Sequence, residues 1–209
     1  MNGKLIIPAC LESWAAENTR VRDILDSEYA GLLKSTYNAL LVDELFTSKV
    51  HGVGHIERAI LLGAIIAKAQ KLDLHEAQML LLCCSYHDTG RKSDWLDTGH
   101  GEVSAQKITR SPLKEQFADF DSEDFAVMRA AIAAHSASDT KMSDMAPKYG
   151  VNEAHSERFF RIARCLKDAD NLDRVRIHDL DVRHLRHEES VALADFAQWL
   201  LEKYEAALK

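Results

Sequence analysis

The sequence predicts an all-helical protein. Apolar residues recur at intervals of three and four almost throughout the 209 residues, and the alternating runs of β-branched residues that would predict strands are absent from the sequence. With 46% hydrophobic residues the chain can bury one substantial core, and three prolines and nine glycines are too few for a linker-rich or disordered protein. We therefore expect one helical domain over residues 1–209.

The apolar periodicity divides the chain into successive predicted helices. Their expected ranges are Leu11–Leu33, Lys34–Lys49, His55–Lys71, Glu76–Asp88, Glu102–Thr109, Ser122–His135, Glu157–Val175 and Glu188 to the C-terminus. Ser122 is the predicted N-cap of its helix, because acidic residues follow it in the first turn, where the helix dipole favours them. Residues 136–152 are polar and contain a proline and a glycine, which predict a surface loop.

Composition narrows the possible functions. The chain has 26 Lys and Arg against 33 Asp and Glu, and a net charge of −7 disfavours stable nucleic-acid binding through phosphates. No apolar stretch is long enough to span a membrane, and the apolar start at residues 5–10 is shorter than that of a signal peptide. The four cysteines show no CxxC spacing and are expected to be reduced core thiols, so a cytoplasmic location is expected.

An ionisable pair follows the most apolar run of the sequence. His87 and Asp88 come shortly after Met79–Cys84, a run with no polar residue. Burial of such a pair is costly unless an opposite charge or a ligand compensates it. A metal ion would compensate both side chains at once.

Other ionisable residues take core-facing positions on predicted helices. His135 continues the stripe of Phe125, Met128 and Ile132, which are spaced three and four residues apart. Asp170 falls in the middle of an apolar face. That face consists of Phe159, Ile162, Ala163, Leu166 and Ala169.

The remaining acids of that helix take different positions. Asp168 falls on the side opposite to Asp170 and is expected to be solvated. Asp173, at the edge of the stripe, could support Asp170 or a substrate. His55 opens the most apolar helix after a glycine-rich entry. Together His55, His87, Asp88 and Asp170 supply two nitrogens and two oxygens from separate helices, a set suited to Mn²⁺, Fe²⁺, Mg²⁺ or Zn²⁺.

Three motifs in this order resemble the HD-domain superfamily of metal-dependent phosphohydrolases, whose motif is H…HD…D. The segment from His51 to Arg58 is similar to the family's first-ligand motif, residues 87–91 to its central motif, and residues 167–173 to its last. The resemblance spans about residues 51–175. It implies an HD-domain-like helical bundle in which His55, His87, Asp88 and Asp170 hold a buried divalent ion.

The resemblance leaves the number of ions open. Some members of the superfamily add two histidines and bind two metal ions, and His100 and the core-facing His135 could fill those places. Asp88 would then bridge the ions through its two oxygens. If either histidine is not a ligand, it would instead protonate the leaving oxygen.

Positive charges near the predicted ligands suggest an anionic substrate. Arg58, Arg91 and Lys92 lie within a few residues of them and are candidate phosphate contacts. His51 is interpreted as a loop histidine at a glycine turn. A basic cluster either faces the pocket or offsets nearby acids. Its members are Arg174, Arg176, Arg183, His184, Arg186 and His187.

These motifs predict an enzyme. The expected reaction is hydrolysis of a phosphate ester of a nucleotide or other small phosphorylated metabolite, with metal-bound hydroxide as the nucleophile and one or two divalent ions. An alternative is an HD-type di-iron oxygenase that cleaves C–C or C–P bonds with O₂. A third possibility, a degenerate domain that only binds, is disfavoured because every predicted ligand position is intact.

Overall fold

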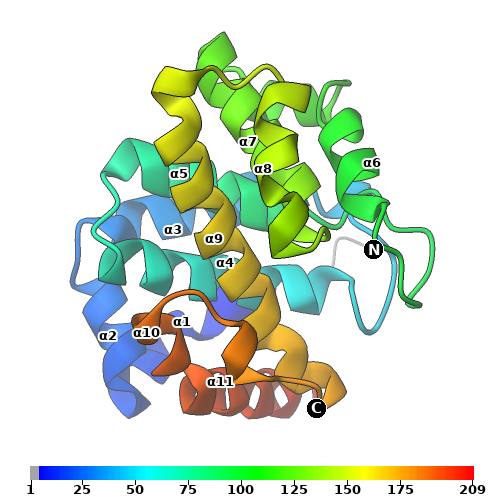
Figure 1. Cartoon of the computed structure of the whole chain (residues 1–209). Helices are drawn as coiled ribbons and strands as arrows, with labels where there is room; N and C mark the ends of the chain where they lie inside the picture. The colour runs from blue at the N-terminus through cyan, green and yellow to red at the C-terminus, as the bar shows by residue number, and fades with distance from the viewer. Residues whose placement is uncertain (1–4) are drawn as a thin grey trace.

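A computed structural model describes residues 5–209, and this part of the chain folds into helices with no strand (Figure 1). The predicted all-helical class is therefore confirmed. The α-helices are α1 (Ile6–Glu17), α2 (Thr19–Leu25), α3 (Tyr29–Ala39), α4 (Val53–Ala69), α5 (Leu74–Tyr86), α6 (His100–Lys107), α7 (Ser122–His135), α8 (Asp139–Lys148), α9 (Ser156–Leu172), α10 (Glu188–Val191) and α11 (Ala194–Ala207). Short 3-10 helices join them: η1 (Val42–Glu44), η2 (Leu113–Phe117), η3 (Glu153–His155), η4 (Asp173–Ile177) and η5 (Val182–His184).

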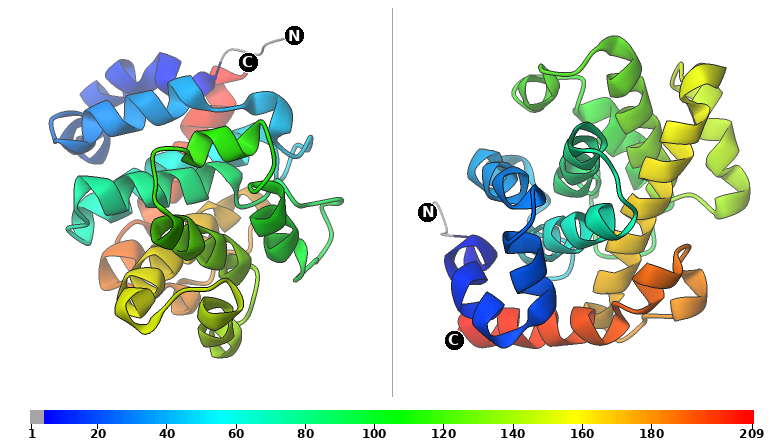
Figure 2. Two further views of the ribbon diagram at one scale, coloured as in Figure 1. Left: turned by 90° about the horizontal axis from the view of Figure 1, so that it is seen from above. Right: turned by 90° about the vertical axis from the view of Figure 1, so that its left-hand side faces the viewer.

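Helices α4, α5, α7 and α9 form the centre of the bundle. Helix α4 packs against α5 and α9, and α9 also packs along α7. Helices α1 to α3 lie on one side of this centre, α6 and α8 lie beside α7, and α11 crosses the far end (Figures 1 and 2). Residues 55–67 of α4 are all buried, as expected from a sequence that is apolar nearly all round.

The first two predicted helices are wrong in their boundaries. The chain breaks at Asn18, whose side chain accepts a hydrogen bond from the N–H of Arg20 at 2.9 Å and caps α2. A second break follows at Ser27, whose hydroxyl donates to the carbonyl of Ile24. Helix α3 ends at Ala39, so Lys34–Lys49 is not one helix. Side-chain hydrogen bonds of this kind compete with the backbone hydrogen bonds of a helix. They do not change the spacing of the apolar residues, so the periodicity does not reveal the breaks.

The predicted loop over residues 136–152 is also wrong in part, because it contains α8. Pro147 lies in the last turn of this helix, where only one carbonyl loses its partner, and Gly150 follows with a φ of +81°. Met142 and Met145 are buried on its inner face. The N-cap of α7 is Asp121, which accepts a hydrogen bond from the N–H of Asp124 at 2.8 Å, and not Ser122, the first residue of that helix.

Three of the four cysteines lie in the core as predicted. Cys83, Cys84 and Cys165 are buried free thiols, whereas Cys10 is only half-buried. Within residues 5–209, every helix is too short or too polar to cross a membrane.

A buried carboxylate connects the two ends of the chain to α4. Glu57 is fully buried and accepts hydrogen bonds from the N–H of Ile7 at 2.8 Å and from the hydroxyl of Tyr204 at 2.7 Å. Tyr37 donates to the carbonyl of Glu57 at 2.7 Å. Burial raises the pKa of Glu57, and these hydrogen bonds oppose the shift. Helices α1, α3 and α11 are thus fixed to one turn of α4.

The substitution Glu57→Ala should lower the free energy of unfolding by about 2–4 kcal/mol, because it leaves two buried donors without an acceptor and opens a cavity. Urea unfolding followed by circular dichroism measures this change. The exposed Glu12, which pairs with Lys34, provides the control Glu12→Ala, for which little change is expected. Equal stability of the two variants would contradict the role given to Glu57.

Candidate metal centre

The six predicted ligands all lie at helix ends, and these ends meet. His55 is in the first turn of α4 and His100 begins α6, whereas His135 ends α7. His87 and Asp88 directly follow α5, and Asp170 is in the last turn of α9. The central packing of these helices therefore brings together residues that are up to 115 positions apart in sequence.

The first group of donors consists of His55, His87, Asp88 and Asp170. The Nε2 atoms of His55 and His87 are 3.1 Å apart, and Asp170 Oδ1 lies 3.4 Å from the first and 3.8 Å from the second. Asp88 Oδ2 lies 3.7 Å from His55 Nε2. Ligands at about 2.1 Å from a common ion are about 3 Å apart, so these separations suit a metal ion.

The second group consists of His100 and His135 around the other oxygen of Asp88. Oδ1 of Asp88 lies 2.9 Å from Nε2 of His100 and 3.5 Å from Nε2 of His135. The two Nε2 atoms are 2.8 Å apart. Asp88 thus lies between two groups of donors, the arrangement expected of a carboxylate that bridges two ions.

The hydrogen bonds of the four imidazoles fix where their protons lie. His55 Nδ1 donates to Asp173 Oδ2 at 2.8 Å, His87 Nδ1 to the carbonyl of Cys84 at 2.9 Å, and His135 Nδ1 to the carbonyl of Ile132 at 2.6 Å. His100 Nδ1 bonds the carbonyl of Asp97. Because these acceptors carry no proton, each neutral ring directs an Nε2 lone pair inward.

Converging lone pairs need a positive partner. The Nε2 pairs at 3.1 Å and 2.8 Å would repel one another if no proton or cation lay between them. Oδ1 of Asp88 is buried and has no hydrogen-bond donor within the described chain. The buried histidines and aspartates could therefore hold a metal ion.

Burial and neighbouring charges together shift the pKa values of these groups. Burial lowers the pKa of His55 and of His135 to about 4, so both rings are neutral near pH 7. Burial opposes ionisation of Asp88 and Asp170, but the imidazole of His87 and its neighbours hold the pKa of both carboxyls well below the usual range. For His87 burial is likewise outweighed, by Asp88 and Asp170, and its pKa is raised.

The centre is almost closed to solvent. Asp170 has the most exposed side chain of the six, at 22%, and the others are at most 4% exposed. Asp170 therefore marks the edge at which the centre is open to solvent.

Residues beside the ligands on α9 connect the centre to neighbouring elements. Lys167 donates to the carbonyls of Ala134 and His135 at 3.1 Å and 3.3 Å and so caps the end of α7. Asp168 is fully buried, not solvated as predicted, and accepts hydrogen bonds from the N–H of Arg186 at 2.9 Å and from His187 Nδ1 at 2.8 Å. The prediction failed because the segment around Arg186 and His187 covers this side of α9.

Two of the three predicted phosphate contacts, Arg58 and Lys92, are not free side chains at the centre. Arg58 is buried, and its Nε and Nη2 donate to Asp173 at 2.6 Å and 3.0 Å. Because Asp173 also accepts from His55, Arg58 helps to hold the carboxylate that orients this histidine. Lys92 is exposed on the loop after α5. Arg91 does reach the centre, because its Nε donates to Asp88 Oδ2 at 2.8 Å.

His51 and Arg176 belong to the centre, although neither is among the predicted ligands or phosphate contacts. His51 is buried, and its Nδ1 lies 3.1 Å from Asp88 Oδ2 and 3.0 Å from Nη2 of Arg176. His51 lies in the turn that precedes α4, four residues before His55, and its place in the segment from His51 to Arg58 is the signal that could have identified it. Arg174 and Arg183 pair locally, with Asp179 and Asp181, whereas Arg186 and His187 bind the buried Asp168 of α9.

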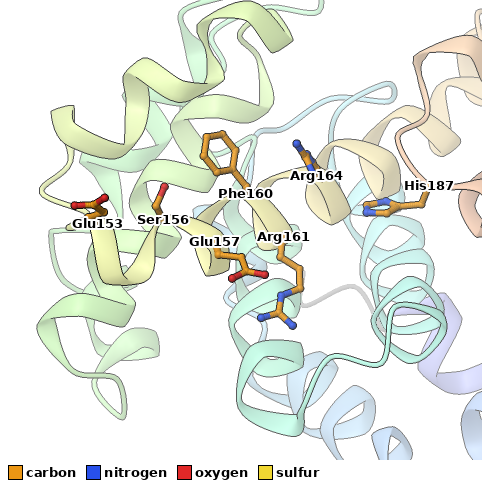
Figure 3. Close-up of a pocket in the computed structure, with 7 residues that line it drawn as sticks. All are labelled: Glu153, Ser156, Glu157, Phe160, Arg161, Arg164 and His187. Atoms are coloured by element: carbon orange, nitrogen blue, oxygen red, sulfur yellow. The ribbon is translucent and has the colours of Figure 1, made fainter.

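A separate groove of about 570 Å³ lies on the outer face of α9 (Figure 3). It is lined by Glu153, Ser156, Glu157, Phe160, Arg161, Arg164 and His187. Two of its polar side chains already have partners, since Arg161 pairs with Glu76 at 3.0 Å and His187 with Asp168. The groove shares no residue with the metal centre.

Comparisons of the chain with protein-family models, curated proteins and solved structures give no match. The resemblance to the HD domain therefore stays a prediction from three motifs.

Asp173→Asn should weaken metal binding about 10- to 100-fold, because the neutral amide no longer fixes His55 with Nδ1 protonated and Nε2 free. Titration with Zn²⁺ against a competing chelator measures the affinity. The exposed Asp179 provides the control Asp179→Asn, which should bind as the wild type does. Unchanged affinity in a folded Asp173→Asn variant would show that Asp173 does not support the site.

The pH dependence of stability in chelator should depend on His135. The unfolded chain protonates this histidine near pH 6.5 and the folded chain only near 4, so acidification favours unfolding through this group. Between about pH 7 and pH 5 the loss is about 2 kcal/mol, and His135→Gln should remove it. Urea unfolding of both proteins at the two pH values is the measurement. The raised pKa of His87 acts in the opposite direction in both proteins. Parallel pH profiles would contradict the assignment.

Proposed function

We propose that the chain is a metal-dependent phosphohydrolase of the HD-domain type, which hydrolyses a phosphate ester of a nucleotide or another small phosphorylated metabolite. The observation that carries this proposal is the convergence of four imidazoles on Asp88 and Asp170, each imidazole with its Nδ1 bonded to a fixed acceptor. Nitrogen and carboxylate donors of this kind suit Mn²⁺, Fe²⁺, Mg²⁺ or Zn²⁺.

In this proposal His55, His87, Asp88 and Asp170 hold one ion, and His100 and His135 hold a second together with Asp88. A bound divalent ion would supply a Lewis acid for the phosphate oxygens and a water of lowered pKa as the nucleophile. Asp173 orients His55, and Lys167 fixes the end of α7 that carries His135.

Arginines next to Asp88 are the candidates for phosphate binding. Arg91 reaches Asp88 through Nε, and within residues 5–209 its terminal nitrogens have no hydrogen-bond acceptor, so they are available for phosphate oxygens. Arg176 lies behind His51 and adds positive charge on the same side of Asp88. Two fixed guanidiniums near the carboxylates favour an anionic substrate in a protein of net charge −7.

A di-iron oxygenase is the second candidate, because two groups of imidazoles around one bridging carboxylate also suit two iron ions. The two reactions differ in their need for O₂. Hydrolysis with Mn²⁺ under anaerobic conditions supports the phosphohydrolase, whereas two irons per chain with an absorption band that changes on addition of O₂ support the oxygenase.

Asp88→Asn should lose bound metal and phosphate release together while it keeps its helical content. The purified protein is first analysed for metals and then screened anaerobically for phosphate release from nucleotides and sugar phosphates with each candidate ion. Asp119→Asn, at an exposed position away from the centre, is the control and should retain both properties. Hydrolysis by the Asp88→Asn variant at the wild-type rate would exclude the proposed role of the centre.

A further inference from the structure

The two most exposed large apolar side chains of residues 5–209 are neighbours on the loop that joins α5 to α6. Trp95 is 83% exposed and Leu96 is 95% exposed. The loop projects from the bundle beside α6 (Figure 1). Side chains of this size gain stability when they are covered, and an adjacent exposed pair is typical of a binding surface.

Both ends of this loop, residues 91–99, are bonded to the surroundings of Asp88. At its start, Nε of Arg91 donates to Asp88 Oδ2 at 2.8 Å. At its end, the carbonyl of Asp97 accepts a hydrogen bond from Nδ1 of His100, whose Nε2 lies 2.9 Å from Asp88 Oδ1. The loop therefore begins at one oxygen of Asp88 and ends at a histidine beside the other.

A third contact holds the middle of the loop near the same carboxylate. The hydroxyl of Ser48 donates to Asp94 and accepts a hydrogen bond from the N–H of His51 at 3.0 Å. Nδ1 of His51 lies 3.1 Å from Asp88 Oδ2. The loop is thus attached at three points to residues that contact Asp88.

Trp95 and Leu96 form the tip between two of these fixed points. They are the two residues between Asp94 and Asp97 in the sequence. Because consecutive Cα atoms are about 3.8 Å apart, the Cα atoms of both tip residues lie within about 8 Å of those of Asp94 and Asp97. The tip therefore stays beside the candidate metal centre although its side chains are in solvent.

The loop also borders the more exposed side of Asp88. Of the side chains that contact this carboxylate, Arg91 and His51 are the most exposed, at 11% and 9%. The loop begins at Arg91 and is anchored three residues before His51. A phosphate that reaches the terminal nitrogens of Arg91 would therefore have the loop next to it.

We infer that Trp95 and Leu96 determine the specificity of the proposed phosphohydrolase by holding an aromatic group of the substrate, whose phosphate lies at Arg91. An indole ring has a flat apolar face on which a nucleobase or another aromatic ring stacks, whereas a sugar alone offers it little apolar surface. This inference rests on the proposed function. It narrows the substrate from small phosphorylated metabolites in general to phosphate esters that carry an aromatic ring.

Calorimetric titration of the Zn²⁺-loaded full chain with two phosphonates tests this inference. The probes are the analogues of AMP and of ribose 5-phosphate in which a methylene group replaces the bridging oxygen, so neither is hydrolysed and only the first carries a base. The AMP analogue should bind at least about tenfold more tightly, as stacking on an aromatic side chain provides. Trp95→Ala should abolish this preference, whereas Trp95→Phe, which keeps an aromatic ring, should retain most of it.

Leu96→Ala should reduce the same preference. Its matched control is Leu74→Ala, also at an exposed leucine but at the start of α5, and this variant should keep the preference of the wild type.

Tryptophan fluorescence gives a second readout. The chain has three tryptophans, of which Trp14 is buried and Trp199 is half-buried, so Trp95 is the one that a ligand in solvent can cover. The AMP analogue should change the emission of the wild type and leave that of Trp95→Phe unchanged.

Equal binding of the two phosphonates by the wild type would overturn the inference but not the phosphohydrolase proposal. Binding of neither phosphonate would contradict the proposed phosphate site as well. Equal binding together with a dimer that Trp95→Ala dissociates, measured by analytical ultracentrifugation, would assign the exposed pair to a second copy of the chain and overturn the inference.

Discussion

The structure depends on one electrostatic constraint: the Nε2 atoms of four imidazoles and two carboxylates share a space from which water is almost excluded. Their Nδ1 atoms are already committed to carbonyls and to Asp173, so the rings cannot relieve the repulsion by exchanging tautomers. A cation resolves this conflict for every donor at once. The convergence of five helix ends therefore forms a candidate site for a metal ion.

The segment 167–173, at the end of α9 and the start of η4, organises this arrangement through four polar residues. Lys167 caps α7, Asp168 holds the segment that enters α10, Asp170 faces the imidazoles, and Asp173 orients His55. Their side chains point in different directions around the helix, and each meets a different neighbour. The segment 167–173 thus fixes the positions of several ligands besides the one it supplies.

His135 and Asp170 continue apolar stripes, and His87 and Asp88 follow an apolar run. Such local patterns were sufficient for the all-helical class and for predicting side chains that the structure brings together. They failed where a side-chain hydrogen bond ends a helix, and where a side chain pairs with a residue that is distant in sequence. Asn18 ends a helix by capping the next one, and α8 forms although Pro147 and Gly150 are present. The pairing of Arg58 with Asp173, 115 residues later, and the burial of Asp168 depend on tertiary contacts that periodicity does not encode.

Anomalous diffraction from crystals grown with Mn²⁺ tests the central claim most directly. We predict a peak within bonding distance of Nε2 of His55, Nε2 of His87 and a carboxylate oxygen of Asp170, with the carboxylate of Asp88 also next to the peak. A map at the manganese edge with no peak among these residues, from crystals in which surface sites do bind manganese, would contradict the presence of a metal centre.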